Sequence, residues 1–313
     1  MTHSKLILAT RQSPLALTQS RWVAAEIERL NPGLRVELAN LTTTGDKMQT
    51  QPLPQIGGKG LFTKELEDAL LEGRAHLAVH SLKDLPTQLP DGLTLAAVPP
   101  REDVRDVLVS RSGAPLHELP HGARIGTSSI RRAAQLRRVR PDLHIEPLRG
   151  NLDTRLRKLK EGPLDAIVLA AAGIHRLGWA EQITEYLAPE ILCPAVGQGA
   201  LGIEACSHDK ATLAALAPLE DFRSRLSATA ERSLLLRLGG GCQIPIAAHT
   251  AFENEHTTTM TLIALVISPD GTQWINAKEQ SSELTVASAE DLGARCAEHL
   301  LRQGAQAILQ LPA

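Results

Sequence analysis

The stretch 238–247, LGGGCQIPIA, joins residue types that could do chemistry at close spacing. Three glycines run into Cys242, although glycine loses backbone entropy on folding and adds no side-chain packing. A backbone this bare indicates that a bulky group approaches the thiol. Cys242 could be a nucleophile, a metal ligand, a covalent anchor or a small buried residue. A catalytic cysteine needs a histidine partner, which the sequence does not locate. A zinc site needs a second cysteine nearby, which Cys193, Cys206 and Cys296 do not offer.

A basic region indicates an anionic ligand. Residues 121–160 contain eleven Lys or Arg against three acidic residues, a charge of +8, while the rest of the chain carries −10. Within it, hydroxyl side chains and then two arginines stand where a predicted strand gives way to a helix, an arrangement that binds carboxylate or phosphate well. A capping serine followed by solvated arginines is an equal alternative for this stretch alone. The residues concerned are Thr127, Ser128, Ser129, Arg131 and Arg132.

Similar residues follow other predicted strands. Arg149 follows a strand, and Arg155 lies about one helical turn later. Arg11 and Ser13 repeat the strand, arginine and capping-serine order near the N-terminus. Two lobes that each direct cations and helix starts at a cleft would hold a polyanion. Asp84, just after a buried strand, is either a carboxylate facing that cleft or a salt-bridged surface acid, the commoner case.

Two short motifs have weaker interpretations. His117–His121 reads HELPH and matches a zinc signature, but Pro120 would break the helix that must place both histidines on one face. We therefore expect no metal site. Gly57–Gly60, GGKG, lacks the spacing and the hydroxyl of a phosphate loop. We interpret it as a hinge beside a helix, although its N–H groups could contact an anion.

The elements that position these residues alternate between strands and helices up to about residue 170, a rhythm that predicts parallel sheets covered by helices. After about 218 the pattern becomes a long helix, strands near 257–268 and 273–280, and a helix near 288–303. The fold class is therefore α/β with a small C-terminal α+β unit. Residues 42–60 show no periodicity, and we expect them to form a mobile lid. We divide the chain into a first lobe (1–99 and 200–217), a second lobe (100–199) and a C-terminal domain (218–313).

Composition narrows the classes of protein. The 313 residues are 43% hydrophobic and 22% charged, as in globular proteins. We expect no signal peptide, because the apolar run in residues 1–10 is too short for one, and no apolar run is long enough to span a membrane. The four scattered cysteines favour a reducing, cytoplasmic setting. No recognition-helix pattern accompanies the arginines, so we expect no nucleic-acid partner. A two-lobed binding protein without catalysis is the main alternative, but it leaves the Gly-Gly-Cys stretch unexplained.

The chain resembles the porphobilinogen deaminase (hydroxymethylbilane synthase) family nearly end to end. The stretch GGCQIPI (240–246), after Glu231-Arg232, matches that family's cofactor-attachment signature. The other motifs that carry the resemblance are ATRQSPLAL (9–17), GGKGLFTKELE (57–67), VHSLKDLP (79–86), REDVRD (101–106), IGTSSIRR (125–132), LRGNLDTRL (148–156), AAGIHRLG (171–178) and PAVGQGALGIE (194–204).

The resemblance implies an activity and a cofactor. Four porphobilinogen molecules would be joined head to tail with loss of ammonia, and hydrolysis would release linear hydroxymethylbilane for tetrapyrrole (haem) biosynthesis. A dipyrromethane cofactor would be held by a thioether to Cys242, and the glycines would make room for its rings. The family's fold has three domains, the first two like a two-lobed periplasmic binding protein. We expect a monomer whose partner is the small-molecule substrate.

The resemblance also implies residue roles. Asp84 matches the catalytic aspartate, which would stabilise positive charge as ammonia leaves. Phe62 matches an aromatic residue near the incoming ring. Gln55 departs from a bacterial relative that carries lysine, so we assign it no cation role. The residues implied to contact cofactor or substrate carboxylates are Arg11, Ser13, Ser81, Lys83, Thr127, Ser128, Ser129, Arg131, Arg132, Arg149, Arg155, Arg176 and Gln198.

Overall fold

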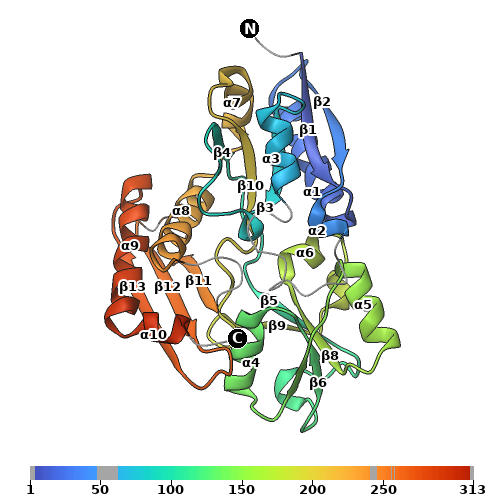
Figure 1. The fold of residues 1–313 in the computed structure, drawn as a ribbon, viewed down its shortest axis with the longest axis vertical. Coiled ribbons are helices and arrows are strands. Elements are labelled where there is room, and N and C mark those ends of the chain that lie inside the picture. The colour runs from blue at the N-terminus through green and yellow to red at the C-terminus, as the bar shows by residue number, and fades with distance from the viewer. Residues whose placement is uncertain (1–3, 48–62, 240–244, 255, 257, 311–313) are drawn as a thin grey trace. The chain divides into compact units, whose positions relative to one another are not determined.

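A computed structural model describes residues 4–47, 63–239, 245–254, 256 and 258–310 of the chain (Figure 1). The chain forms two compact units. The first unit comprises residues 1–102 and 200–225, and the second comprises residues 103–199 and 226–313. Within the described residues, no helix is both long and apolar enough to cross a membrane.

The first unit is built on a five-stranded mixed sheet in the order β2-β1-β3-β10-β4. β1 pairs in parallel with β2 and β3, whereas β10 runs antiparallel to both β3 and β4. The prediction of parallel strands is therefore confirmed for β1, β2 and β3 and was wrong for β10, because the chain segment that re-enters this unit supplies a strand in the opposite direction. The strands are β1 (Lys5–Arg11), β2 (Arg35–Leu41), β3 (Leu77–Ser81), β4 (Leu93–Ala97) and β10 (Leu201–Cys206).

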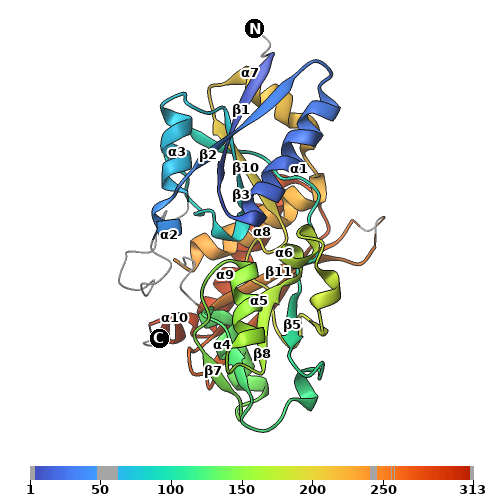
Figure 2. The same cartoon turned by 90° about the vertical axis from the view of Figure 1, so that its right-hand side faces the viewer.

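Helices cover both faces of this sheet, as Figure 2 shows for α1 (Pro14–Leu30) and α3 (Lys64–Leu71). On one face, Val23 and Ile27 of α1 pack on alternate residues of β1 and β3, together with α7 (Lys210–Leu216). On the other face, Leu66 and Leu70 of α3 pack in an apolar layer with Ala9 and Ala78. Along β1 and β3, successive side chains therefore alternate between the face covered by α1 and the face covered by α3.

The predicted lid falls largely outside the described residues. Within 42–47 the structure has one helical turn, α2 (Thr44–Lys47). Thr44 donates to Glu65 of α3 from its backbone nitrogen at 2.7 Å and from its hydroxyl at 2.6 Å.

The second unit contains a five-stranded mixed sheet in the order β7-β6-β8-β5-β9. β6 is parallel to β7 and β8, as predicted, whereas β5 is antiparallel to β8 and β9, where the prediction of parallel strands was wrong. The core on one face includes Leu136 of α4, and that on the other includes Leu156 of α5 and Ile174 of α6. The elements are β5 (Asp106–Ser110), β6 (Arg124–Gly126), α4 (Ile130–Val139), β7 (His144–Glu146), α5 (Leu152–Glu161), β8 (Ala166–Ala170), α6 (Ala171–Arg176) and β9 (Glu185–Leu187).

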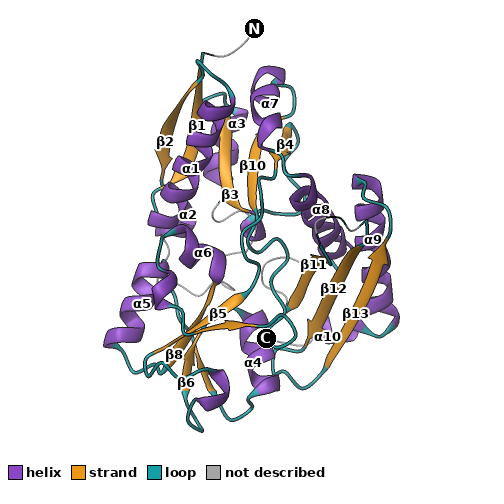
Figure 3. Ribbon diagram, turned by 180° about the vertical axis from the view of Figure 1, so that it is seen from behind, coloured by secondary structure: helices purple, strands orange, loops and turns teal. Residues whose placement is uncertain are grey.

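The second unit also contains a separate three-stranded antiparallel sheet (Figure 3). Its strands are joined in sequence order, and its core includes residues of the helices α8, α9 and α10. The turn between β12 and β13 contains Gly271, which has a φ of +81° and whose added Cβ would lie 2.6 Å from the Ala134 oxygen of α4. β11 lies outside the strands predicted for this part of the chain. The elements are α8 (Phe222–Arg237), β11 (Ile246–Phe252), β12 (Met260–Ile267), β13 (Trp274–Ser281), α9 (Val286–Arg302) and α10 (Ala305–Leu309).

Candidate functional site

In the first unit, predicted site residues gather where β1 and β3 end. The register that pairs Ala9 with Ala78 brings Arg11 level with His80, one residue before Ser81. Parallel strands end at the same edge of a sheet, which is where ligands bind in α/β folds. Ser13 follows β1 and caps α1, since its Oγ accepts a hydrogen bond from the Ala16 nitrogen at 3.3 Å. The predicted capping role of Ser13 is therefore confirmed.

Asp84 belongs to a short 3-10 helix, Leu82–Asp84, that follows β3 directly. The Leu82 nitrogen donates to the Ala200 oxygen at 3.0 Å, which ties this turn to the chain just before β10. Lys83 is half-buried and Asp84 is exposed. Ser81 accepts a hydrogen bond at 3.2 Å from the side-chain nitrogen of Gln19, a buried residue of α1 that the sequence analysis missed.

In the second unit, the three hydroxyl residues between β6 and α4 organise the backbone around the start of that helix. The Thr127 hydroxyl accepts from the Ser129 nitrogen at 3.2 Å, and the Ser128 hydroxyl donates to the Leu148 oxygen at 3.0 Å. Ser129 is the N-cap of α4 and accepts from the Arg132 nitrogen at 3.4 Å. The first turn of α4 is thereby fixed relative to the segment that follows β7.

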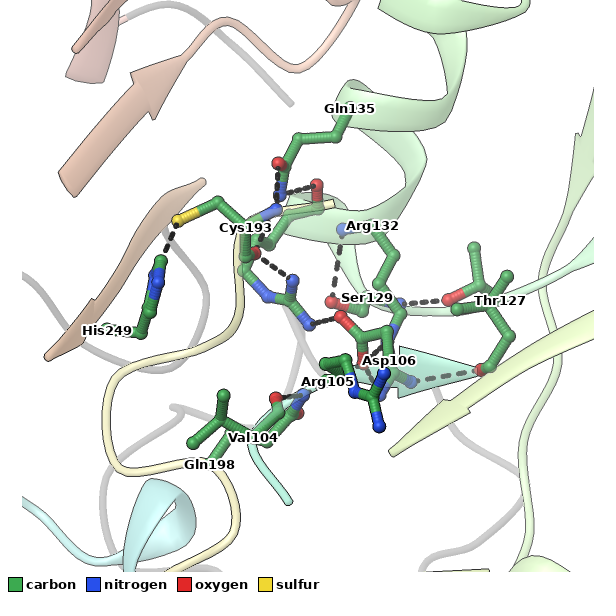
Figure 4. A network of polar contacts seen from close by, with 12 residues as sticks. Val104, Arg105, Asp106, Thr127, Ser129, Arg132, Gln135, Cys193, Gln198 and His249 are labelled. Carbon is green, nitrogen blue, oxygen red and sulfur yellow. Dashed lines mark hydrogen bonds and ion pairs between the residues drawn. The ribbon is translucent and has the colours of Figure 1, made fainter. Parts of the chain in front are cut away.

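Asp106, the first residue of β5, binds both arginines of the predicted site (Figure 4). Its Oδ2 accepts from Arg131 Nη2 at 2.8 Å, and its Oδ1 accepts from Arg132 Nη2 at 2.6 Å and Nε at 2.9 Å. Asp106 is fully buried and the arginines are each 6% exposed, so the alternative of solvated arginines was wrong. Burial alone would raise the pKa of Asp106, but the charges and hydrogen bonds of the two guanidinium groups outweigh it and lower that pKa to about 2.

The charge of this group fits an acidic ligand. Two guanidinium groups share one carboxylate, so Arg131, Arg132 and Asp106 together carry one positive charge in a buried place. Both guanidinium groups also donate to backbone oxygens, Arg131 Nη1 to that of Cys193 and Arg132 Nη1 to that of Val168 at 3.0 Å. The formal net positive charge of the group favours an anionic neighbour, and carboxylates are one such group.

Gln198 joins the same network from the segment that precedes β10. Its side-chain nitrogen donates to the Val104 oxygen at 2.8 Å and to Asp106 Oδ1 at 3.0 Å (Figure 4). Nearby, the Gln135 amide binds both the nitrogen and the oxygen of Cys193, at 2.7 and 3.1 Å. These contacts fasten the segment 193–198 to α4 and β5.

Three further arginines predicted to bind carboxylates are half-buried in the second unit. Arg155 Nε donates to the Gly150 oxygen at 2.8 Å, and Arg176 Nη2 donates to the Gly199 oxygen at 2.7 Å. The Arg149 oxygen accepts from Lys158 at 3.1 Å. Arg149 and Arg155 flank the start of α5, directly after the segment to which Ser128 is bound.

The described cysteines differ from what a nucleophile requires. Cys193, Cys206 and Cys296 are free thiols and all are buried. Burial raises the pKa of Cys193 and of Cys296 to about 12, and it also raises that of Cys206. These thiols are therefore protonated at neutral pH, and the thiolate is the reactive form.

Some predicted residues lie outside the described residues, namely Cys242, Phe62, Gln55 and the stretch 57–60. The zinc-like motif is described, and its 3-10 helix Leu116–Glu118 ends at Leu119, which has a ψ of 140°. His117 and His121 therefore do not share a helix. Among the residues with described positions, no group of three metal-binding side chains is placed to hold an ion.

Replacing Asp106 by Asn should lower the free energy of unfolding by about 3–5 kcal/mol, because two buried guanidinium groups would lose their counter-charge. Urea unfolding would measure the change. Asp291→Asn is the matched control, since Asp291 pairs with Arg295 at a side chain that is 64% exposed and should cost less than about 1 kcal/mol. A loss below about 1 kcal/mol for Asp106→Asn would contradict the assigned pairing.

The stability of the wild-type chain should also depend on this carboxyl in acid. The folded pKa of Asp106 is lowered to about 2, so the stabilisation from its ionised form is present above the ordinary pKa of about 3.9 and is lost as the pH falls from there toward 2. Unfolding curves recorded across this window should fall more steeply with acid for the wild type than for Asp106→Asn.

Comparisons with known proteins identify one family along nearly the whole chain. The family model "Porphobilinogen deaminase, dipyromethane cofactor binding domain" matches residues 6–214, and "Porphobilinogen deaminase, C-terminal domain" matches residues 225–302. The porphobilinogen deaminase of Syntrophotalea carbinolica is 50% identical over 309 residues, 99% of this chain and 96% of that protein. That of Syntrophobacter fumaroxidans is 50% identical over 310 residues, 99% of this chain and 98% of that protein.

Two of the solved structures that match part of this chain are a methionine-binding protein and a lipoprotein. The Methionine Binding Protein, MetQ, is 15% identical with a TM-score of 0.41, covering 69% of this chain and 89% of that one. The YaeC-family lipoprotein of Enterococcus faecalis is 13% identical with a TM-score of 0.40, covering 69% of this chain and 91% of that one. The family models and the full-length identity together show that this chain belongs to the porphobilinogen deaminase family.

Proposed function

We propose that this chain is a hydroxymethylbilane synthase, a transferase that polymerises porphobilinogen head to tail with loss of ammonia and releases linear hydroxymethylbilane by hydrolysis. The observation that carries the proposal is family membership across both domain models, at about half identity to curated porphobilinogen deaminases. The net positive, buried Arg131–Arg132–Asp106 group supports it, because each ring of the substrate bears carboxylates.

The family model names a dipyrromethane cofactor, and Cys242 is our proposed attachment point through a thioether. When bound, this group supplies the pyrrole carbon to which the first substrate ring is joined. Arg131 and Arg132 would hold carboxylates with guanidinium donors that Asp106 has already oriented. Pre-oriented donors lose little entropy when a ligand binds, which favours tight holding of acidic rings.

Other residues are also proposed to contact ligand carboxylates, and several of them follow the carboxyl ends of parallel strands within their own unit. In the first unit they are Arg11, Ser13, Ser81 and Lys83, and Phe62 is proposed to lie near the incoming ring. In the second unit they are Thr127, Ser128, Ser129, Arg149, Arg155, Arg176 and Gln198. Hydroxyl and cationic donors of this kind suit the paired carboxylates of a pyrrole ring.

Asp84 is the proposed catalytic residue. Its exposed carboxylate, on a turn that is hydrogen-bonded to Ala200, would face the positive charge that develops on the substrate as ammonia departs. A fixed negative group placed where charge develops lowers the barrier, because it needs no reorganisation during the reaction.

We also propose the domain boundaries, the cellular location and the oligomeric state of the enzyme. The three sheets and the two family-model boundaries support two lobes (1–99 with 200–217, and 100–199) and a C-terminal domain from 218. Free, buried thiols at Cys193, Cys206 and Cys296 support a reducing, cytoplasmic location. We propose a monomer without a nucleic-acid partner, in line with the absence of recognition motifs in the sequence.

The activity is tested by incubating the purified chain with porphobilinogen. Substrate consumption, ammonia release and the mass of a linear tetrapyrrole should rise together. A binding protein without catalysis, the main alternative, would bind porphobilinogen and release no ammonia. Consumption no faster than in buffer would contradict the proposed function.

Replacing Arg149 by Leu should weaken substrate use more than it weakens the fold. A charge-assisted hydrogen bond is worth about 1.5–3 kcal/mol, so kcat/KM should fall by about 10- to 150-fold while the melting temperature changes by only a few degrees. Arg157→Leu on the exposed side of α5 is the control and should change neither. Arg132→Leu should lower both activity and stability, since it also breaks the pairing with Asp106. An Arg149 variant with full activity and a large loss of stability would indicate a structural role.

A further inference from the structure

A buried group of three titratable side chains lies in the first unit, apart from the residues discussed so far. His80 Nε2 of β3 is 3.0 Å from Glu204 Oε2 of β10, and the two side chains are 5% and 0% exposed. Glu67 of α3 is 7% exposed and feels the charges of both. We call these three residues the His80 cluster.

The cluster sits in the apolar layer between the sheet and α3. Leu66, Leu70 and Ala78 belong to that layer, and Ala78 is paired with Glu204 across the β3–β10 ladder. The pairing of β10 with β4 shifts register between Ile203 and Glu204, and such bulges re-aim side chains. The strand geometry thus directs a carboxylate into an apolar layer, where an unpaired charge is costly.

The polar atoms of the cluster are not all satisfied. Among the described residues, Glu204 Oε1 and Glu67 Oε1 are buried and have no hydrogen-bond partner. Two buried carboxyl groups beside one imidazole place negative charge in an apolar layer, and a proton held on a carboxyl lowers that charge and turns an acceptor into a donor. Burial raises the pKa of Glu67, the charge of Glu204 adds to this, and the nearby Thr63 side chain and the charge of His80 oppose it.

Other titratable groups surround the cluster on each neighbouring element. Asp68 follows Glu67 on α3 and also raises the pKa of Glu67. Cys206 of β10 donates to the Leu70 oxygen at 3.2 Å, and burial keeps its thiol neutral by raising its pKa. Arg11 ends β1 on the face that Ala9 shares with α3, and it is half-buried at the edge of the sheet.

The position of the cluster links it to the proposed catalytic turn. His80 is the last buried residue of β3, and Ser81, Lys83 and Asp84 follow within four positions. β10 supports this turn on the other side, through the pairing of Leu201 with Ser81 and the Leu82–Ala200 hydrogen bond. An uncompensated charge in the cluster would be relieved by separating β3 from β10 or from α3, and either movement would displace the turn.

We propose that His80, Glu204 and Glu67 form a buried, proton-holding cluster that positions the turn bearing Lys83 and Asp84. The proposal rests on the proposed function, because Asp84 is the group being positioned. The three residues are positioning residues and touch no substrate. The cluster keeps its arrangement while the Glu67 carboxyl holds its proton, and it loses that arrangement as rising pH removes the proton.

Kinetics of two variants test the positioning role. Glu204→Gln removes the partner charge of His80 and should lower kcat by about 10- to 100-fold, the effect of a displacement of about 1 Å, with KM within about twofold. Glu67→Gln fixes the uncharged form, so its kcat should lose the alkaline fall that accompanies ionisation of Glu67 in the wild type. Glu72→Gln, an exposed residue at the end of α3 that is paired with Arg74, is the control and should match the wild type in both readouts.

An infrared measurement tests the proton without any turnover. The wild type near neutral pH should show the carbonyl stretch of a buried carboxylic acid, and Glu67→Gln should lack it. Absence of the band, or a Glu204→Gln variant with lower melting temperature but unchanged kcat and pH profile, would overturn the proposal. A wild-type chain that fails to consume porphobilinogen would instead refute the proposed function, and the infrared band would still report on the cluster.

Discussion

Replacement of Cys242 by Ser should remove both the covalently bound cofactor and nearly all activity. The wild-type chain should have an intact mass above its 33.7 kDa sequence mass by one dipyrromethane, and the variant should have the bare mass. Serine is close in size but stays un-ionised near neutral pH, so it is a far poorer nucleophile than a thiolate. We expect the rate to fall on the order of 10³-fold or more, the scale seen when a covalent nucleophile is removed.

The other cysteines supply matched controls for this experiment. Cys193, Cys206 and Cys296 are buried, and their raised pKa values keep them as neutral thiols. Their Ala variants should keep the excess mass. The Cys242→Ser variant should also unfold at a lower temperature, because a group that binds only the folded chain stabilises it. An active preparation with the bare sequence mass would contradict the anchor.

Local patterns predicted where the donors lie but not what binds them. Hydroxyls before Arg131 and Arg132 correctly predicted the start of a helix, and Ser129 caps it. The carboxylate of Asp106 lies on another strand, 25 and 26 positions earlier in the chain. A count of charges along the sequence cannot distinguish an arginine that is paired internally from one that awaits a ligand, because both are equally basic.

Strand direction was the other feature that periodicity did not predict. The alternation of strands and helices indicated sheets covered by helices, and both large sheets have them. Yet β5 and β10 run antiparallel to their neighbours, since the chain enters each of them from a strand of the other large sheet. Apolar spacing gives the face that a residue occupies and carries no information on the direction of pairing.

Polar pairs between residues that are far apart in the sequence could not be predicted either, because local patterns carry no information on which distant residues meet. Gln19 and Ser81 are 62 positions apart, and His80 and Glu204 are 124 apart. Each member, taken alone, is an ordinary polar residue beside an apolar run. The motif VHSLKDLP carried the resemblance to the family and so placed Asp84, but it gave no sign that its histidine is buried against a carboxylate.

Replacement of Asp84 by Asn should leave the fold and the bound cofactor intact while removing most turnover. The two side chains are nearly the same size, and Asp84 is exposed, so the melting temperature should change little. The amide cannot supply the negative charge that stabilises the cation formed as ammonia leaves. Loss of one such electrostatic group lowers kcat by about 10²–10³-fold. Single-turnover measurements with porphobilinogen would show whether the loss lies in the chemical step.

A second exposed aspartate separates this effect from a general change in surface charge. Asp91 lies in the loop before β4, and Asp91→Asn should keep the wild-type rate and the cofactor mass. If Asp84→Asn retained activity within a few-fold of the wild type, the catalytic assignment would fail while the family membership would stand. If Asp84→Asn instead lost the cofactor mass, the residue would act in cofactor assembly, because the same elimination of ammonia has to precede attachment of each ring.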